Sequence, residues 1–294
     1  MRIGIGLLLS ATLALGQLRG VVDAHTHGAP DSQDWKIDVL ETARLAKAEG
    51  MRAIVLKSHN APTAQLAYLV GKLTPGIEVY GGIALNRSVG GLNPAAIETQ
   101  ANFTGHFLRI VWFPTYDAEN NVRGLREKRP WVSIAKDGRL TPEATEVLRT
   151  IQRLNLVMAT GHSSAEEDLL LVAEARKMGI QRMVVTHPLY YLIRMSIPQM
   201  QRAAQMGAYL ELCGNALLPA TPEERKLKVE DYAKTIHAVG AEHLILSSDL
   251  GQTYNPVLTE GWKIFVEKLR QAGVTQKEID TMARRNPAKL LGLE

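Results

Sequence analysis

The sequence predicts an α/β fold, a single-domain (β/α)8 TIM barrel, from three observations. The chain has 294 residues, a length that such barrels fill as one domain, and no Ser/Gly-rich or single-sign linker divides it. Eight short apolar runs alternate with helical segments. Metal-binding residue types recur where several of these runs end, at the edge where barrel enzymes carry their active sites.

The eight expected strands are residues 21–27, 52–59, 77–85, 106–115, 156–162, 182–188, 208–213 and 243–249. Most are continuous apolar runs, as strands of a parallel sheet buried on both faces require. A doubly wound sheet is the alternative, but no Gly-x-Gly-x-x-Gly follows any of these runs. The barrel is therefore the preferred fold.

The helical segments between the strands begin with start signals, in which an N-cap residue precedes a first-turn proline or acid. The clearest are Thr141-Pro142-Glu143, Ser164-Ala165-Glu166-Glu167, Thr221-Pro222-Glu223-Glu224 and Thr275-Gln276-Lys277-Glu278. The connection after the fourth strand is unusually long, from Tyr116 to Leu140. A loop of that length in a compact domain is typical of a lid or a substrate-binding element.

The formal net charge of +4 is spread over helices of mixed sign and forms no basic stripe. This pattern favours a small-molecule substrate and argues against a nucleic-acid partner. The single cysteine, Cys213, excludes an internal disulfide and a cysteine-rich zinc site. The sequence leaves open whether the chain forms a homo-oligomer.

The first residues have the pattern of a secretory signal peptide. Arg2 precedes the apolar run 3–15, and Ala14-Leu15-Gly16 offers small residues for cleavage before Gln17. We therefore expect a leader at 1–16, a barrel domain at 17–294 and a periplasmic or secreted protein. The alternative is a cytoplasmic protein that keeps this run to close the bottom of the barrel. The run is too short to span a membrane, so we expect no stable membrane insertion.

The candidate metal ligands stand at the C-terminal ends of predicted strands. His25 and His27 are separated by one residue, and side chains at i and i+2 of a strand point to the same face. His162, His187 and Asp249 end the fifth, sixth and eighth strands. Neutral imidazoles and a carboxylate suit Zn²⁺ and similar divalent ions, so the sequence predicts a site for one or two such ions.

These residues resemble the amidohydrolase superfamily of metal-dependent hydrolases, which has His-x-His on strand one, histidines on strands five and six and Asp on strand eight. The segment 279–292 also looks like the closing helices of that superfamily. The resemblance implies that His25, His27 and Asp249 hold the more buried metal, and that His162 and His187 hold the second. It further implies a metal-bound hydroxide as nucleophile, with Asp249 handling the proton.

The chain departs from this pattern at strand four, because residues 107–115 contain neither the lysine nor the glutamate that bridges the metals in many members. Lys57, at the end of strand two, is the available substitute. A bare ammonium beside two cations would be repelled, so we favour a carbamylated Lys57 as the bridge. The alternative is that Lys57 binds a substrate anion beside a single metal. His59 shares the parity of Lys57 and is expected to donate a hydrogen bond to the substrate or transition state.

Two further residues are candidates for substrate binding. Arg87, just after the third strand, could meet a substrate carboxylate or be a solvated loop residue. Tyr190, after the sixth strand, could form a pocket wall or ordinary packing. Glu211 and Cys213 share one face of the seventh strand, but the sequence does not show which face.

The predicted function is metal-dependent hydrolysis of an amide, cyclic amide or ester bond in a small molecule. Three alternatives remain: a phosphotriesterase or lactonase, a mononuclear non-oxidative decarboxylase, and a non-catalytic metal-binding or solute-binding barrel. The state of Lys57 discriminates between the enzymes, because a carbamylated bridge implies two metals and hydrolysis.

Overall fold

The computed structural model describes residues 16–294. It contains one parallel eight-stranded sheet in the order β1 (Val22–Thr26), β2 (Ala53–Leu56), β3 (Glu78–Ala84), β4 (Leu108–Trp112), β7 (Val157–Ala159), β8 (Met183–Val185), β9 (Tyr209–Cys213), β10 (Leu244–Ser247). A parallel bridge from Thr26 to Leu250 and a 2.9 Å hydrogen bond from Asp249 N to His25 O join the last strand to the first. The predicted (β/α)8 barrel is therefore confirmed, and each strand lies inside its predicted segment. The predicted leader lies outside the described residues except for Gly16 and stays a prediction.

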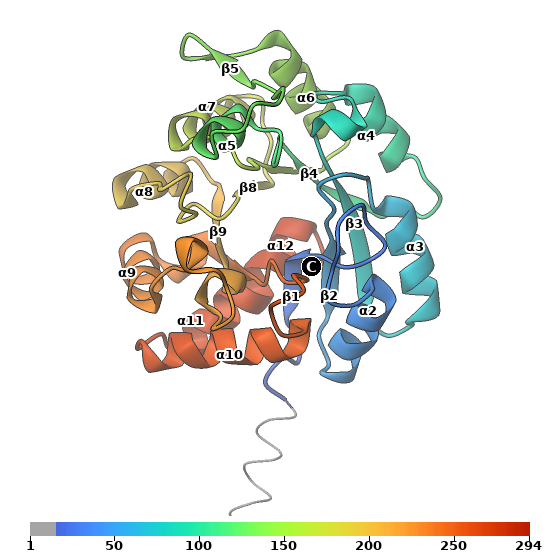
Figure 1. Ribbon diagram of the computed structural model, residues 1–294, viewed down its shortest axis with the longest axis vertical. Coiled ribbons are helices and arrows are strands. Elements are labelled where there is room, and N and C mark those ends of the chain that lie inside the picture. Colours follow the sequence, from blue (N-terminus) through green and yellow to red (C-terminus); the bar gives the residue numbers. More distant parts are fainter. Residues whose placement is uncertain (1–15) are drawn as a thin grey trace, which may run out of the picture.

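Helices surround the barrel (Figure 1). They follow the strands in order as α2 (Val39–Ala48), α3 (Ala64–Leu73), α4 (Pro94–Ala101), α6 (Pro142–Arg153), α7 (Ala165–Lys177), α8 (Ile197–Gln205), α9 (Val229–Val239) and α10 (Leu258–Gln271). The long connection after β4 contains α5 (Glu119–Gly124) and a hairpin of β5 (Ala135–Lys136) and β6 (Arg139–Leu140). The chain ends with α11 (Gln276–Asp280) and α12 (Asn286–Leu291).

Three of the predicted helix starts are confirmed by their capping bonds. Thr141 accepts from Ala144 N, and Ser164 and Thr275 each form a complete capping box. The predicted start at Thr221 is wrong. The Thr221 hydroxyl instead binds the carbonyl of Asn215, so the chain makes a short 3₁₀ turn, Glu223–Arg225, before α9 begins.

The barrel has an apolar interior that is separate from the larger core under the outer helices. Small and branched strand residues such as Val22, Ala53 and Val184 fill the interior together with Leu290 and Leu291 of α12. The Asn286 amide at the start of α12 donates to the carbonyl of Leu244, the first residue of β10. Helix α12 therefore closes the N-terminal end of the barrel, and the opposite end is left for the site.

The register between β1 and β2 shifts between Asp23 and Thr26. Such a shift breaks the simple alternation of side chains along a strand. Asp23 accepts a 2.6 Å hydrogen bond from the indole of Trp262 in α10, whereas His25 turns towards Glu211 of β9. Strand β1 thus holds α10 through Asp23 and supplies His25 to the centre of the site.

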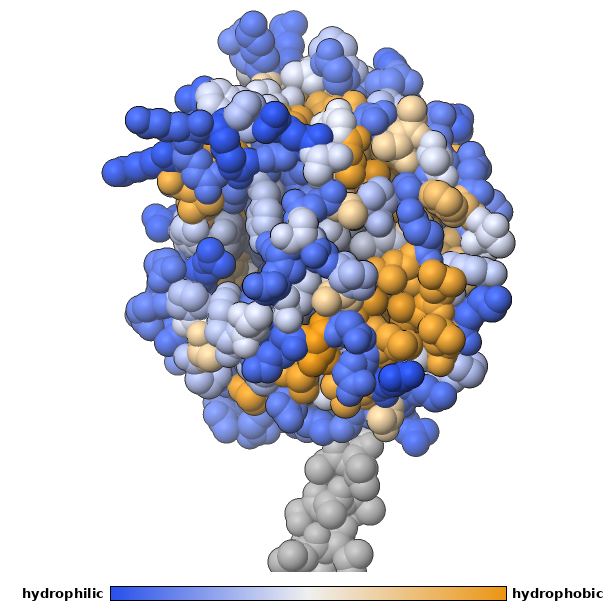
Figure 2. Space-filling model, turned by 45° about the vertical axis from the view of Figure 1, so that its right-hand side comes forward, coloured by the Kyte–Doolittle hydropathy of each residue, from blue (hydrophilic) through white to orange (hydrophobic). Residues whose placement is uncertain are grey.

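The surface carries an apolar patch on the flank that holds α2 and α3 (Figure 2). On α3, Leu69 and Leu73 are 55% and 64% exposed. Within residues 16–294, no helix is both long enough and apolar enough to cross a bilayer.

Candidate active site

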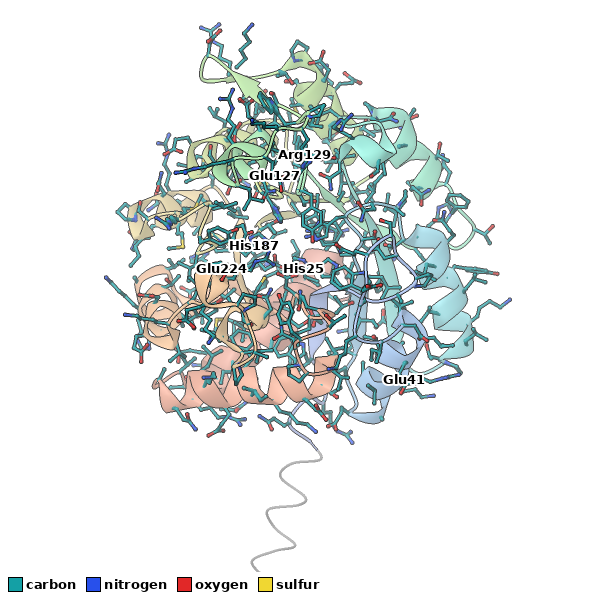
Figure 3. All side chains as sticks on the ribbon, in the orientation of Figure 1. His25, Glu41, Glu127, Arg129, His187 and Glu224 are labelled. Carbon is teal, nitrogen blue, oxygen red and sulfur yellow. The ribbon has the colours of Figure 1, made fainter. Side chains whose placement is uncertain are left out.

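A cavity of about 330 Å³ opens at the C-terminal ends of the strands. Figure 3 shows His25 and His187 near the barrel axis, while Glu41 lies at the periphery. The structure brings together in the cavity lining most of the residues that the sequence singled out: His27, Lys57, His59, His162, His187, Tyr190 and Asp249. His25 lies fully buried against His27, Lys57 and Asp249. Arg87 does not reach the cavity, because a 3₁₀ turn after β3 places it in an exposed position where its backbone N–H binds Asp117.

The compact part of the site is a trio of donor atoms from β1 and the end of β10. Asp249 Oδ1 lies 3.1 Å from both His25 Nε2 and His27 Nε2, and these two nitrogens are 3.2 Å apart. Ligand atoms about 2.0–2.1 Å from a tetrahedral zinc ion lie roughly 3.3 Å from one another. The trio therefore fits a divalent metal in both chemistry and spacing.

Two of these ligands are oriented by neighbouring polar side chains. Glu211 Oε2 lies 3.2 Å from His25 Nδ1, and Asn215 Nδ2 donates to Asp249 Oδ2 at 2.9 Å. A carboxylate on the far nitrogen of an imidazole fixes its tautomer and turns the other nitrogen to a metal. Burial raises the pKa of Glu211, but His25 beside it brings that pKa below its usual value, so Glu211 is anionic.

His187 and Asp249 enter the site through an unusual backbone conformation. Their φ angles are 27° and 51°, which few residues other than glycine adopt. Each follows the last residues of its strand, where the turn aims the side chain into the barrel mouth. Strain of this kind costs roughly 1–3 kcal/mol and is typical of functional positions.

The second pair of predicted ligands lies across the cavity. The rings of His162 and His187 have centroids 4.9 Å apart, and His187 lies 6.1 Å from His25. Asn121 Oδ1 is 3.3 Å from His162 Nδ1, while His187 Nδ1 is buried without a hydrogen-bond partner. Burial lowers the pKa of His187 to about 4, so its neutral ring can accept a metal.

The state of Lys57 decides between two hypotheses that the sequence left open: a carbamylated bridge between two metals, and a cation that binds a substrate anion beside one metal. Its Nζ is buried, 2.9 Å from His25 Nε2 and 5.1 Å from the centre of the Trp112 ring. Burial lowers the pKa of Lys57, which favours a neutral amine. The position beside the trio is compatible with a bridging role.

One wall of the cavity is a stack of four rings. Trp35 stacks on His27 with centroids 4.6 Å apart, His27 lies 5.0 Å from His59, and Tyr116 covers His59 at 3.7 Å. Tyr116 comes from the long connection after β4, so that connection does contribute to the cavity. Within this stack His27 and His59 are only 2% and 5% exposed.

His59 is held from behind by a chain of hydrogen bonds. Asn86 Oδ1 accepts from the backbone N–H of Thr115, which leaves its amide nitrogen to donate to the Thr115 hydroxyl at 2.7 Å. That hydroxyl lies 2.8 Å from His59 Nδ1 and is free to donate to it. The proton of the neutral ring then sits on Nε2.

The sequence left the placement of some site residues open and did not identify others. Glu211 and Cys213 both line the cavity, which settles their face. Glu211 is a carboxylate in the otherwise apolar strand Tyr209–Cys213, and this pattern could have identified it as a site residue. Arg225 lies in a segment that was expected to be helical. Asn121 lies in the long connection after the fourth strand, where nothing in the sequence distinguished it.

The positioning role of Glu211 gives a direct prediction. We expect Glu211→Gln to lower metal affinity about 10–100-fold, because a neutral amide supports the His25 ring less strongly than a carboxylate does. Chelator competition measures this affinity without any substrate. Glu41→Gln, the same change at an exposed peripheral site, is the control and should leave the affinity unchanged. Equal affinities for Glu211→Gln and the parent protein would contradict the assignment.

A (β/α)8 barrel with a histidine–histidine–aspartate trio at its C-terminal mouth defines a metal-dependent hydrolase of the amidohydrolase superfamily. Two family models each match more than half of the chain: the phosphotriesterase family matches residues 135–291, and a family of unknown function (DUF6282) matches residues 20–211. The chain belongs to the phosphotriesterase family and to this second, overlapping family.

Solved structures resemble the chain over nearly its whole length. A probable dipeptidase from Pseudomonas aeruginosa has a TM-score of 0.67 and 12% identity, with 97% of this chain and 98% of that chain covered. A mutant of organophosphorus hydrolase from Deinococcus radiodurans has a TM-score of 0.62 and 18% identity, with 95% and 94% covered. A putative 2-pyrone-4,6-dicarboxylic acid hydrolase from Pseudomonas putida has a TM-score of 0.61 and 16% identity, with 94% and 98% covered. Likeness at these identities shows the fold alone. No curated protein sequence matches the chain.

Proposed function

We propose that this protein hydrolyses a carboxylic ester, lactone or amide bond of a small molecule. The observation that carries the proposal is the buried trio of His25, His27 and Asp249 in a cavity of about 330 Å³. A cavity of that volume suits a small organic substrate. His162 and His187 face the trio across the cavity and are the candidates for a second ion.

The metal ion and the side chains would contribute different parts of the chemistry. When bound, a divalent ion, which we propose to be zinc, would supply a water molecule of lowered pKa and polarise the substrate carbonyl. Asp249 would hold the ion together with His25 and His27, accept a proton from the attacking water and donate it to the leaving group. Burial raises the pKa of Asp249, but His25 and His27 bring it well below its usual value, so the side chain is an anion, the form that binds a metal ion.

His59 donates a hydrogen bond from Nε2 to the substrate oxygen on which negative charge develops. The Asn86–Thr115 chain orients the ring for this role. Burial lowers the pKa of His59 well below its usual value, so the ring is neutral and acts as a donor through a single N–H. A donor placed in advance at such a position stabilises the transition state more than the ground state.

Metal removal tests the proposal. We expect chelator-treated protein to lose hydrolysis of simple esters, lactones and amides, and stoichiometric Zn²⁺ or another divalent ion to restore it. Activity on each substrate class is measured with the metal content determined in the same samples. Hydrolysis that persists in protein shown to be metal-free would contradict the proposal.

A further inference from the structure

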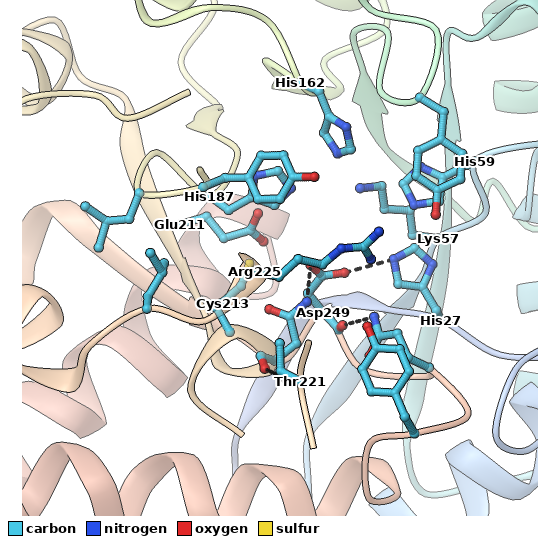
Figure 4. A pocket seen from close by; sticks show the side chains of 18 of the residues that line it. His27, Lys57, His59, His162, His187, Glu211, Cys213, Thr221, Arg225 and Asp249 are labelled. Atoms are coloured by element: carbon cyan, nitrogen blue, oxygen red, sulfur yellow. Dashed lines mark hydrogen bonds and ion pairs between the residues drawn. The ribbon is translucent and has the colours of Figure 1, made fainter. Parts of the chain in front are cut away.

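Arg225 lies at the mouth of the active-site cavity. It ends the 3₁₀ turn Glu223–Arg225 between β9 and α9, and its side chain belongs to the cavity lining. Figure 4 shows the side chain extended into the cavity, towards the side that carries His27. The guanidinium group therefore points into the cavity that also contains His27 and Asp249 of the metal-binding trio.

Two of the three carboxylates in the cavity lining are bound to other partners, and the third, Asp34, is exposed and forms no ion pair within residues 16–294. Glu211 lies against His25, and Asp249 lies against His25, His27 and Asn215. On the turn itself, Glu223 pairs with Lys226 at 2.9 Å. Throughout residues 16–294, no carboxylate forms an ion pair with Arg225.

The neighbours of Arg225 are tyrosines. Partial burial lowers the pKa of Arg225, but Tyr190, Tyr254 and Tyr191 together bring that pKa above its usual value, so the group is a permanent cation. Tyrosine rings and hydroxyls can frame a guanidinium group, but they do not neutralise its charge. The other basic side chain of the lining, Lys57, lies 2.9 Å from His25 Nε2.

A planar guanidinium with parallel N–H donors matches one carboxylate in a bidentate arrangement. A single positive charge also balances a single carboxylate. From this geometry we propose that Arg225 binds a carboxylate of the substrate, remote from the scissile bond, and that the protein acts on anionic esters, lactones or amides. This proposal rests on the proposed function and assigns to Arg225 the role that the sequence offered for Arg87.

The test uses metal-loaded protein and two matched esters, 4-nitrophenyl pentanoate and mono-4-nitrophenyl glutarate. They differ only in that a carboxylate replaces the terminal methyl group. We expect Arg225→Gln to lower kcat/KM for the glutarate ester about 10–100-fold, mainly through KM, and to change the pentanoate ester less than about 2-fold. Lys226→Gln, a neighbouring exposed cation, should change neither. Arg225→Lys should recover part of the loss, because it keeps the charge and loses the bidentate fork.

A binding measurement separates this inference from the proposed function. Calorimetry with glutarate, which is not turned over, should show binding to the parent protein and about 10–100-fold weaker binding to Arg225→Gln. Absence of hydrolysis of both esters would contradict the proposed function and leave the glutarate result to decide on Arg225. Equal glutarate affinity in both proteins, no glutarate binding to the parent protein, or an unchanged ratio between the esters would overturn the role of Arg225.

Discussion

Asp249→Asn should reduce hydrolysis by about 10³-fold or more while the barrel stays folded. The substitution removes the charge that faces His25 Nε2 and His27 Nε2 at 3.1 Å, and with it both a metal ligand and the proton acceptor. The fold should tolerate the change. Asparagine accepts the left-handed conformation at φ 51°, and the backbone bond from residue 249 to His25 O is kept.

The measurements are kcat/KM, metal content and thermal unfolding of the same preparation. Asp137→Asn is a matched control, since Asp137 has the same φ of 51° but lies exposed in the turn of the β5–β6 hairpin. It should keep full activity. Retained hydrolysis in metal-free Asp249→Asn protein would refute a metal-assisted mechanism that depends on this carboxylate.

Lys57→Ala should reduce activity by at least about 10²-fold, because removal of a metal-bridging or ligand-orienting group typically costs that much. We propose that Lys57 is carbamylated. Its neutral amine attacks carbon dioxide, an N–C bond forms, and one proton is released to leave an anionic carbamate. Burial lowers the pKa of Lys57, which supplies the required neutral amine, and Nζ lies 2.9 Å from His25 Nε2.

Three readouts distinguish the carbamate from a free lysine. Protein loaded with metal in the presence of ¹³C-bicarbonate should give a carbamate carbon signal that Lys57→Ala lacks. The variant should hold about one metal fewer than the parent protein, and propionate should partly restore its activity by supplying a carboxylate. Lys72→Ala, an exposed change on α3, is the control. A parent protein with one metal and no carbon signal would instead favour Lys57 as a binder of substrate anions.

Most of the barrel could be predicted because parallel strands are short, apolar and regularly spaced. Each of the eight barrel strands falls inside its predicted segment, and the capping residues Thr141, Ser164 and Thr275 mark helix starts correctly. Thr221 carried the same local signal but failed. Its hydroxyl donates to the carbonyl of Asn215, six residues earlier in the same connection, and does not cap a helix.

The candidate ligands could also be named, since a parallel barrel places all C-terminal strand ends on one face. His27, His162, His187 and Asp249 meet there as expected, with His25 beneath them. The residues that support the candidate ligands could not be predicted. Asn121, Asn215 and Thr115 contact the site from connections whose course depends on packing, and their residue types are common in loops.

The sequence by itself determined the strand order, the helix layer and the group of histidines and aspartate at the barrel mouth, because these depend on local periodicity and on the rule that places strand ends together. Only the tertiary structure decided which side chains support or face that group. The face of Glu211 depends on how β9 pairs with β10, and the direction of His25 depends on the register shift in β1. Arg225 lines the cavity and Arg87 does not. The 3₁₀ turn Glu223–Arg225 places Arg225 at the cavity, whereas the 3₁₀ turn Arg87–Val89 leaves Arg87 exposed. Such positions are fixed by contacts between residues far apart in the chain, and no local pattern encodes them.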